Sequence, residues 1–274
     1  MIDVLRLCVW LALLAAIFVP LERRWALHSQ KLLRKAFGTD VIYYFMSGLL
    51  PKVLLLVPIT LLAAGLHRLA PAGFYTWASD MPLGLRVAAA LVVGEIGAYW
   101  GHRWSHEIPW LWRFHAIHHS AEEMDWLVNS RAHPVDLVFT RLCGIIPMYL
   151  LGLAQPMGNR VDLVPLLVSI IGTAWGFFIH ANVKWRLGWL EWLISSPAFH
   201  HWHHTNDGPE RINKNYAAML PWVDRCFGTF YLPRQEWPEK YGIDEPTPAG
   251  LADQLMQPLS PPVRTHRAVS SAPL

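Results

Sequence analysis

The segment SSPAFHHWHHTND, residues 195–207, places four histidines within five positions of a chain that is otherwise rich in apolar residues. In an α-helix, residues i, i+3 and i+4 lie on one face, about one turn apart. His200, His203 and His204 therefore point to a common place, whereas His201 falls outside this HxxHH pattern. Whether the cluster has a function depends on whether other clusters reach the same place.

Two earlier segments have related spacings. The segment HAIHH, residues 115–119, repeats HxxHH, and the segment HRWSH, residues 102–106, has the HxxxH spacing. Together the three motifs direct eight imidazoles from three helical segments. Neutral imidazole binds Zn, Fe, Cu and Ni, and one ion rarely uses more than about four to six ligands. Eight converging rings therefore predict two metal ions. His28, His67 and His266 stand alone and are not expected to be ligands.

The composition indicates an integral membrane protein. Of the 274 residues, 53% are hydrophobic and 16% are charged, well below the roughly 25% charged residues of an ordinary soluble domain. The net charge of +3, without a run of Lys and Arg, gives no reason to expect a nucleic-acid partner. The three cysteines are too few and too scattered for a disulfide framework or a thiolate metal site.

A helix needs roughly 20 mostly apolar residues to cross a bilayer. The segments that qualify are about 4–20, 41–66, 85–100, 135–153 and 163–179. The first is expected to be a retained span, and the second is interrupted by Pro51 and Pro58, so it is either kinked or a re-entrant pair. The fourth carries Asp136 and Arg141 near one end. The predicted fold class is all-α, a polytopic bundle of four to five membrane spans with a histidine-lined helical cap.

Basic residues predict the orientation. The loop after the first span contains Arg23, Arg24, Lys31, Arg34 and Lys35, which favours the cytoplasmic side. Counting spans onward places residues 101–134 and the chain from His180 onward on that same face. A re-entrant second segment would change the side but would keep the histidine motifs together.

The sequence resembles the fatty acid hydroxylase/sterol desaturase superfamily of membrane di-iron enzymes. It has the HxxxH, HxxHH and HxxHH motifs in order, and NSRAHP (residues 129–134) and HAN (180–182) resemble the family's R-x-H-P and H-x-N stretches. Asn215-Tyr216 and PWVDRCFGTF (221–230) resemble its closing N-Y…W-D-x-x-F-G-T segment, with Val223 inserted. His201 stands where an Arg is common. The resemblance covers about residues 85–233, which predicts N-terminal spans in 1–84, a catalytic domain in 85–233 and a disordered tail in 234–274.

The resemblance implies two iron ions, O2 as co-substrate and a separate electron donor, a ferredoxin- or cytochrome-like protein with its reductase. Members of the family hydroxylate or desaturate fatty acyl chains, sterols, carotenoids or ether lipids. The iron ligands that it implies are His102, His106, His115, His118, His119, His200, His203 and His204, with His133 and His180 as additions. Basic residues at 23–35 or 211–214 are the expected docking surface for the donor.

Other residues and other functions are also considered. Glu95, seven residues before His102 inside a predicted span, is either a functional acid or an interhelical hydrogen-bond partner. The carboxylates that could accept from a ligand's second ring nitrogen are Glu107, Asp125, Asp136, Asp207 and Asp224. A His-rich metal transporter is the main alternative, but a transporter should have ligands near mid-membrane. A zinc hydrolase is disfavoured because H-E-x-x-H is absent.

Overall fold

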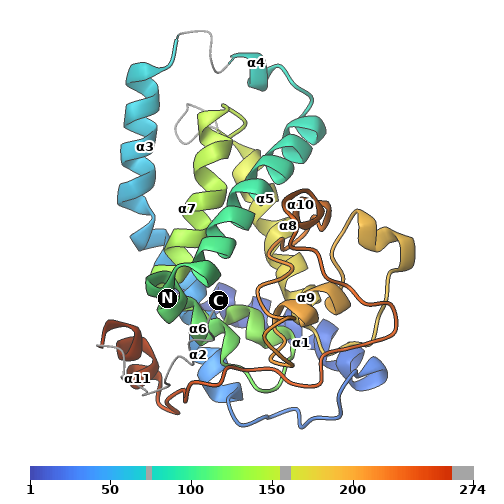
Figure 1. The fold of residues 1–274 in the computed structure, drawn as a ribbon. Helices are drawn as coiled ribbons and strands as arrows, with labels where there is room; N and C mark the ends of the chain where they lie inside the picture. Colours follow the sequence, from blue (N-terminus) through green and yellow to red (C-terminus); the bar gives the residue numbers. More distant parts are fainter. Residues whose placement is uncertain (72–75, 155–161, 261–274) are drawn as a thin grey trace, which may run out of the picture.

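The computed structural model describes residues 1–71, 76–154 and 162–260 and builds them from helices and loops (Figure 1). The α-helices are α1 (Ile2–Trp25), α2 (Phe37–Leu54), α3 (Leu56–Leu69), α4 (Thr76–Ser79), α5 (Leu83–Glu107), α6 (Pro109–His119), α7 (Pro134–Leu150), α8 (Leu163–His180), α9 (Pro197–His203), α10 (Trp222–Phe227) and α11 (Leu251–Met256). Short 3-10 helices lie at Trp126–Ser130, Gly188–Trp192 and Gln257–Leu259. The all-α prediction is confirmed for the described residues.

Four helical segments among the described residues are long and apolar enough to cross a membrane, namely 2–25, 37–69, 83–107 and 163–180. Large apolar side chains such as Leu5 and Val9 on α1 and Leu61 on α3 are exposed, as expected for surfaces that face lipid rather than water. The helix α7, expected as a further span, has 17 residues and is not among these four. The count agrees with the lower end of the predicted four to five spans.

The second apolar segment is one bent unit. The helix α2 ends at Leu54, Leu55 turns, and α3 begins at Leu56. Pro58 explains the break, because a proline ring collides with the carbonyl four residues earlier, which here belongs to Leu54. Figure 1 shows α3 leading away from the histidine-bearing helices and α5 returning to them. The second apolar segment is therefore a kinked helix, one of its two predicted forms, rather than a re-entrant pair.

Proline also begins three helices around the histidine motifs. Pro109, Pro134 and Pro197 occupy the first positions of α6, α7 and α9. Proline is favoured there because its fixed φ suits the helix and its missing N–H would have no intrahelical partner. Ser196 caps α9 by accepting a hydrogen bond from the Phe199 N–H. These signals fix where the histidine-bearing helices begin.

The helices α5 and α7 lie side by side (Figure 1) because glycines on α5 permit close approach. A Cβ atom at Gly97 would collide with the carbonyl oxygen of Cys143, and one at Gly101 would lie 2.7 Å from the Cβ of Cys143. Small residues play this part widely in packed membrane helices. The contact brings the first turn of α7 to the histidine-bearing end of α5, where Ser105 donates a hydrogen bond to Asp136.

Residues 234–260, part of the predicted disordered tail, pack against the rest of the molecule. Gln254 on α11 is buried and its side-chain oxygen accepts a hydrogen bond from the Tyr43 hydroxyl at 3.0 Å. The carbonyl of Lys240 accepts from the Asn206 N–H. The proline-rich composition therefore reflects irregular backbone that is fixed by side-chain and turn contacts. The remainder of the predicted tail, residues 261–274, lies outside the described residues.

Candidate metal centre

The histidine motifs converge into two groups of imidazoles. In each group every ring offers one nitrogen, and these nitrogens lie within 4.8 Å of one another. Cluster A consists of His102, His106, His115, His119 and His203. Cluster B consists of His118, His180, His200 and His204. All eight histidines of the three motifs and the predicted His180 are thus brought together.

The two HxxHH motifs each serve both clusters. On α6, His115 and His119, four residues apart, join cluster A, whereas His118 joins cluster B. At α9 the division is reversed, since His203 joins cluster A and the pair four residues apart, His200 and His204, joins cluster B. The motif therefore spans two neighbouring sites, which differs from the expectation that its three rings point to one place.

The two clusters lie against each other. The rings of His119 in cluster A and His204 in cluster B stack with centroids 4.3 Å apart, and those of His203 and His200 stack at 5.1 Å. Two ions held by these rings would be neighbours, as the resemblance to di-iron enzymes implies.

Backbone and side-chain acceptors fix the orientation of six rings. The Nδ1 atom of His115 lies 3.0 Å from an Asp136 carboxylate oxygen, and that of His106 lies 3.2 Å from Asn213 Oδ1. The other four Nδ1 atoms face backbone carbonyls, which can only accept: His102 to Tyr216 (2.7 Å), His118 to Arg131 (2.9 Å), His180 to Gly176 (2.7 Å) and His203 to Lys214 (2.8 Å). The proton of each neutral ring is therefore held at Nδ1, which leaves the Nε2 lone pair free.

The free Nε2 atoms face one another inside the clusters. Those of His102 and His115 are 3.1 Å apart, and those of His118 and His180 are 3.3 Å apart. With both protons held at Nδ1, neither nitrogen of a pair can donate, so two lone pairs oppose each other. The buried Nε2 atoms of His106, His119 and His203 have no hydrogen-bond partner among the described residues. A cation placed among the nitrogens satisfies all of them, so the residues fit metal ions.

Burial keeps these rings neutral. Desolvation lowers the pKa of His115, His118 and His119 well below the usual value, and neighbouring imidazoles lower it further. The same causes lower the pKa of His200, His203 and His204. A neutral ring is the form that binds a metal ion, because its lone pair is available.

His133, predicted as an additional ligand, lies in neither cluster. Its Nδ1 accepts a hydrogen bond from the backbone N–H of Val135, which makes it the N-terminal cap of α7. Its Nε2 lies 3.1 Å from the carbonyl of Leu255. Both nitrogens are thus engaged by backbone groups, and the residue joins α7 to the C-terminal segment. Its side chain has no ring nitrogen directed at cluster A or cluster B.

Glu95 and His201 are also outside both clusters. One carboxylate oxygen of Glu95 accepts hydrogen bonds from the backbone N–H groups of Met219 (2.6 Å) and Leu220 (3.1 Å). This contact favours the structural alternative for Glu95. His201 is fully buried, and its ring nitrogens lie 2.7 Å from the Tyr241 hydroxyl and 3.1 Å from the Ala181 carbonyl. Burial lowers the pKa of His201 to about 3, so it is a neutral packing residue beside the site.

Five carboxylates were predicted to accept a hydrogen bond from a ring nitrogen. Among the described residues, Asp136 is the one of these five that contacts a ring of cluster A or B. Asp224 acts indirectly. It accepts hydrogen bonds from the backbone N–H groups of Tyr216 and Ala217, and so fixes the loop in which the Tyr216 carbonyl contacts His102. Asn213 was not predicted, and Asn215 was named only as part of the resemblance. Both have positive φ, 58° and 59°, a conformation that Asn tolerates better than most residues. This backbone turn directs Asn213 Oδ1 and the Lys214 carbonyl at two cluster A rings.

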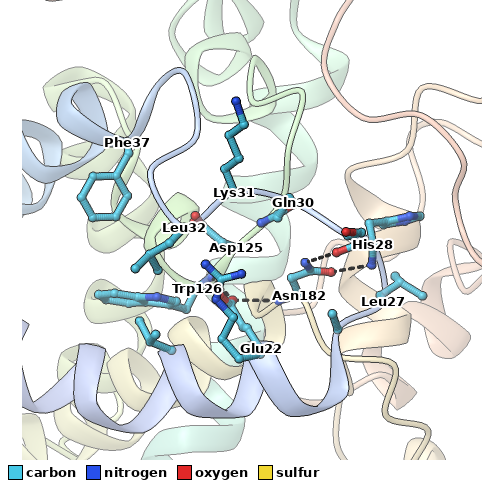
Figure 2. Close-up of a pocket in the computed structure, with 14 residues that line it drawn as sticks. Glu22, Leu27, His28, Gln30, Lys31, Leu32, Phe37, Asp125, Trp126 and Asn182 are labelled. Carbon is cyan, nitrogen blue, oxygen red and sulfur yellow. Dashed lines mark hydrogen bonds between the residues drawn. The ribbon is translucent and has the colours of Figure 1, made fainter.

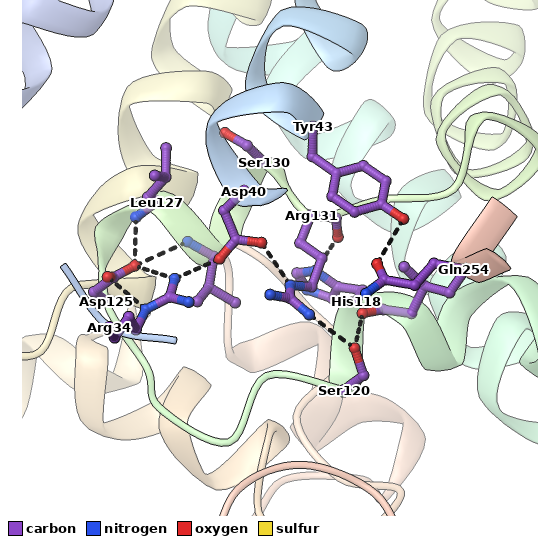
Figure 3. A network of polar contacts seen from close by, with 12 residues as sticks. Arg34, Asp40, Tyr43, His118, Ser120, Asp125, Leu127, Ser130, Arg131 and Gln254 are labelled. Carbon is purple, nitrogen blue, oxygen red and sulfur yellow. Dashed lines mark hydrogen bonds and ion pairs between the residues drawn. The ribbon is translucent and has the colours of Figure 1, made fainter. Parts of the chain in front are cut away.

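A buried ion network supports cluster B (Figure 3). Arg34 pairs with Asp125 at 2.7 Å and with Asp40 at 2.6 Å, and Arg131 pairs with the other oxygen of Asp40 at 2.7 Å. Two positive and two negative charges balance, as buried charges require. Because the carbonyl of Arg131 accepts from Nδ1 of His118, the network fixes the position of a cluster B ring.

A cavity of about 350 Å³ lies where the loop after α1 meets residues that flank cluster B (Figure 2). Glu22 accepts hydrogen bonds from the backbone N–H groups of Trp126 (2.8 Å) and Asn182 (2.9 Å). The Asn182 side chain in turn accepts from His28 N–H and donates to His28 carbonyl. Since Asn182 follows His180 by two residues, the H-x-N stretch joins the basic loop to the clusters.

A larger cavity of about 860 Å³ lies between the spans. It is lined by residues of α2, α3, α5, α7 and α8, and most of them are apolar, such as Leu91, Met148 and Val168. On α5 the lining reaches Ala98, one turn before His102. An apolar chain in this cavity would therefore end about 6 Å along the helix axis from the first cluster A ligand.

The comparisons with known proteins agree with this geometry. Ornithine lipid hydroxylase of Rhizobium tropici is 37% identical over 185 residues, 67% of this chain and 53% of that protein. Human alkylglycerol monooxygenase is 32% identical over 154 residues (56% of this chain, 32% of that protein). Delta(7)-sterol 5(6)-desaturase of Gibberella zeae is 27% identical over 176 residues (62% and 49%).

The chain spans about half the length of the first and third of these relatives and about a third of the second. No solved structure matches it. The sequence model of the fatty acid hydroxylase family matches residues 87–229, more than half of the chain and the part that supplies both clusters. The protein therefore belongs to the fatty acid hydroxylase family.

Proposed function

We propose that the protein is an O2-dependent oxidoreductase that uses two iron ions to hydroxylate or desaturate a membrane lipid. The observation that carries the proposal is the convergence of Nε2 atoms in clusters A and B, with the opposite Nδ1 atoms of six rings held by acceptors. The relatives named as lipid hydroxylase, alkylglycerol monooxygenase and sterol desaturase support the reaction class.

Cluster A would hold one ion and cluster B the other. Bound iron would supply the redox chemistry with O2 that attack on an unactivated C–H bond requires, which Zn2+ does not have. The contribution of the chain is to present neutral rings with free Nε2 atoms, to hold those rings from behind through Asp136 and backbone carbonyls, and to bury the clusters.

The cavity between the spans is the proposed substrate site. Its apolar lining suits a hydrocarbon chain, and its end near Ala98 and Thr140 lies beside the histidine-bearing end of α5. A lipid would enter from the bilayer with its apolar part along Leu91 and Tyr149. Both outcomes, the gain of oxygen and the gain of a double bond, can follow the removal of one hydrogen.

A metal transporter requires ligands along a path through the membrane. The clustered rings come instead from the last turns of α5, α6 and α8 and from α9, at one end of the bundle. This placement favours a fixed cofactor over a transported ion. The side of the membrane is proposed to be cytoplasmic, on the basis of the basic residues in the loop after α1.

Electrons would come from a separate ferredoxin- or cytochrome-like donor with its reductase. Of the two predicted docking segments, 211–214 has the shorter connection to the metals, because the Lys214 carbonyl meets His203 and the Asn213 side chain meets His106. Arg211→Glu with Lys214→Glu is expected to slow electron transfer from the reduced donor without loss of iron. Unchanged transfer would exclude this surface.

The test of the proposed function is lipid profiling by mass spectrometry of cells that express the wild type or His118→Ala. The wild type is expected to produce a lipid species shifted by one oxygen atom or by the loss of two hydrogens, and the variant to produce none. His67→Ala, which changes a histidine on α3 outside both clusters, is the matched control. A wild-type protein that contains iron and changes no lipid would refute the proposal.

A further inference from the structure

The cavity between the spans contains a cation that lacks a partner. Three ionisable residues line it: Lys52, Glu95 and Arg141. Lys52 pairs with Asp3 at 2.6 Å, and Glu95 accepts two backbone N–H groups. Arg141 makes no hydrogen bond, ion pair or ring contact within the part of the chain that the structure describes.

The Arg141 side chain is exposed and lines this cavity, so its guanidinium is available to a ligand. Charged side chains among membrane helices usually pair or mark a binding site. Other arginines near α5 and α7 follow that rule. Arg86 pairs with Asp162, Arg103 with Glu107, and Arg131 with Asp40. Arg141 departs from it, and the surface that it lines is the one proposed to receive a lipid.

The position of Arg141 along α7 is informative. It follows Asp136 by five residues, about 7.5 Å along the helix axis, and its neighbour Thr140 packs on Gly101, next to His102. The cavity continues past it to Tyr149, about 12 Å further along α7. Arg141 thus lies nearer the metal end of the cavity, and most of the apolar lining lies beyond it.

We propose that Arg141 binds the anionic group of the lipid substrate, a carboxylate or a phosphate, and holds that group at the metal end of the cavity. The planar guanidinium can make two parallel hydrogen bonds to either group. This inference rests on the proposed function, and it narrows the substrate class to lipids with a negative charge close to the carbon that reacts. Neutral sterols would not satisfy Arg141.

The experiment compares two probes that share one hydrocarbon chain, oleate and oleyl alcohol. Binding to the purified iron-loaded protein in neutral detergent is measured by native mass spectrometry and by isothermal titration. We expect the wild type to bind oleate about tenfold more tightly than the alcohol, the difference that about 1.4 kcal/mol produces. Arg141→Gln should remove the preference, and Arg141→Lys should keep part of it, because the charge remains and the paired geometry is lost.

Two controls separate this site from general charge effects. Arg6→Gln removes a cation from α1, outside the cavity, and should leave the preference intact. Inorganic phosphate should not displace oleate, because the apolar chain contributes much of the binding. If Arg6→Gln lost the preference for oleate, general charge attraction would explain the binding and the proposal would be wrong. If inorganic phosphate displaced oleate, the site would be one for free anions, and the proposal would also be wrong.

The outcome can be separated from that of the proposed function. If Arg141→Gln keeps its iron and still prefers oleate, the role of Arg141 is wrong while the oxidoreductase assignment stands. If the wild type prefers oleate through Arg141 but oxidises no lipid, the anion site stands and the oxidoreductase assignment fails. Iron content and thermal unfolding of Arg141→Gln show whether the variant has folded.

Discussion

Cluster A gathers five imidazoles, of which His102 and His106 are half-buried, whereas cluster B gathers four, of which three are buried and His118 is 9% exposed. The supports differ as well. Cluster A is held by Asp136, by Asn213 and by carbonyls of the loop after α9, while one ring of cluster B is fixed through the ion network of Arg131. The larger cluster therefore lies toward solvent and the smaller one toward the interior.

Two ions bound in these clusters would have unequal surroundings. A cluster with four rings has less to spare than one with five, since closed metal sites are usually four-coordinate. A cluster with five rings can lose one and keep a full set. The half-buried rings also give cluster A the shorter route to an exogenous chelator. The following predictions test whether this inequality is real, and they are ordered by their expected effect on the metal centre.

The largest effect is expected when a ring is removed from the smaller cluster. His180→Ala leaves cluster B with three rings, so we expect loss of one iron of the two and a fall of more than about 100-fold in lipid oxidation. His106→Ala leaves cluster A with four rings and should retain both ions. Iron content by plasma mass spectrometry, beside lipid profiling, provides the measurement. Equal iron losses in both variants would show that the clusters are equivalent.

A smaller effect is expected at the carboxylate behind cluster A. Asp136→Asn removes the charge that meets Nδ1 of His115, so the iron affinity of cluster A should fall by about 10–100-fold, the usual range for such partners. Chelator titration followed by iron analysis measures it. Asp207→Asn, a carboxylate that bonds the backbone of Glu239 and Lys240, is the control and should titrate as the wild type does.

Loss of the ion network behind cluster B should lower the stability of the fold more than it lowers the metal content. Asp40→Asn leaves Arg34 and Arg131 with one remaining acid between them, and breaking a buried ion pair typically costs about 3–5 kcal/mol. We expect a lower unfolding temperature with near-complete iron in the folded fraction. Asp3→Asn, which removes an exposed pair with Lys52, should leave the unfolding temperature almost unchanged. A similar fall in both variants would contradict the buried network.

The smallest effect on the metals is expected at His133. His133→Ala should retain both ions, because neither ring nitrogen faces a cluster, and should destabilise the fold by about 1 kcal/mol through the lost cap of α7. His133→Asn, which can cap the helix, should restore most of that loss. Thermal unfolding together with iron analysis distinguishes the cap from a ligand. Loss of iron in both variants would return His133 to the ligand set.

The histidine spacings predicted the convergence of the imidazoles because ligand geometry is local to a helix. His102 and His106 are one turn apart wherever their helix lies, so the motif alone indicates a site. Backbone carbonyls carry no such signal. The contact of Tyr216 with His102, or of Lys214 with His203, depends on a loop whose shape comes from Asn213 and Asn215, and any residue type supplies a carbonyl.

Two predictions, the ligand role of His133 and the disorder of residues 234–260, differ from the structure for the same physical reason. His133 and His180 each flank a helix end, and the sequence could not distinguish them, because a cap and a ligand differ only in which way the ring points. Residues 234–260 were predicted to be disordered from their composition, yet Gln254 and the backbone of Lys240 find partners on distant segments. Composition indicates only the intrinsic conformational preference of a segment, whereas these contacts join residues that are far apart in the sequence.

The opposed lone pairs of His102 with His115, and of His118 with His180, bear on how the protein is produced in a cell. Without a cation these pairs repel each other in a buried place, so binding of metal adds directly to the free energy of folding. A newly synthesised chain would then remain open to proteases until iron arrives. The amount of this protein in its membrane would follow the iron supply of the cell, even at a constant rate of synthesis.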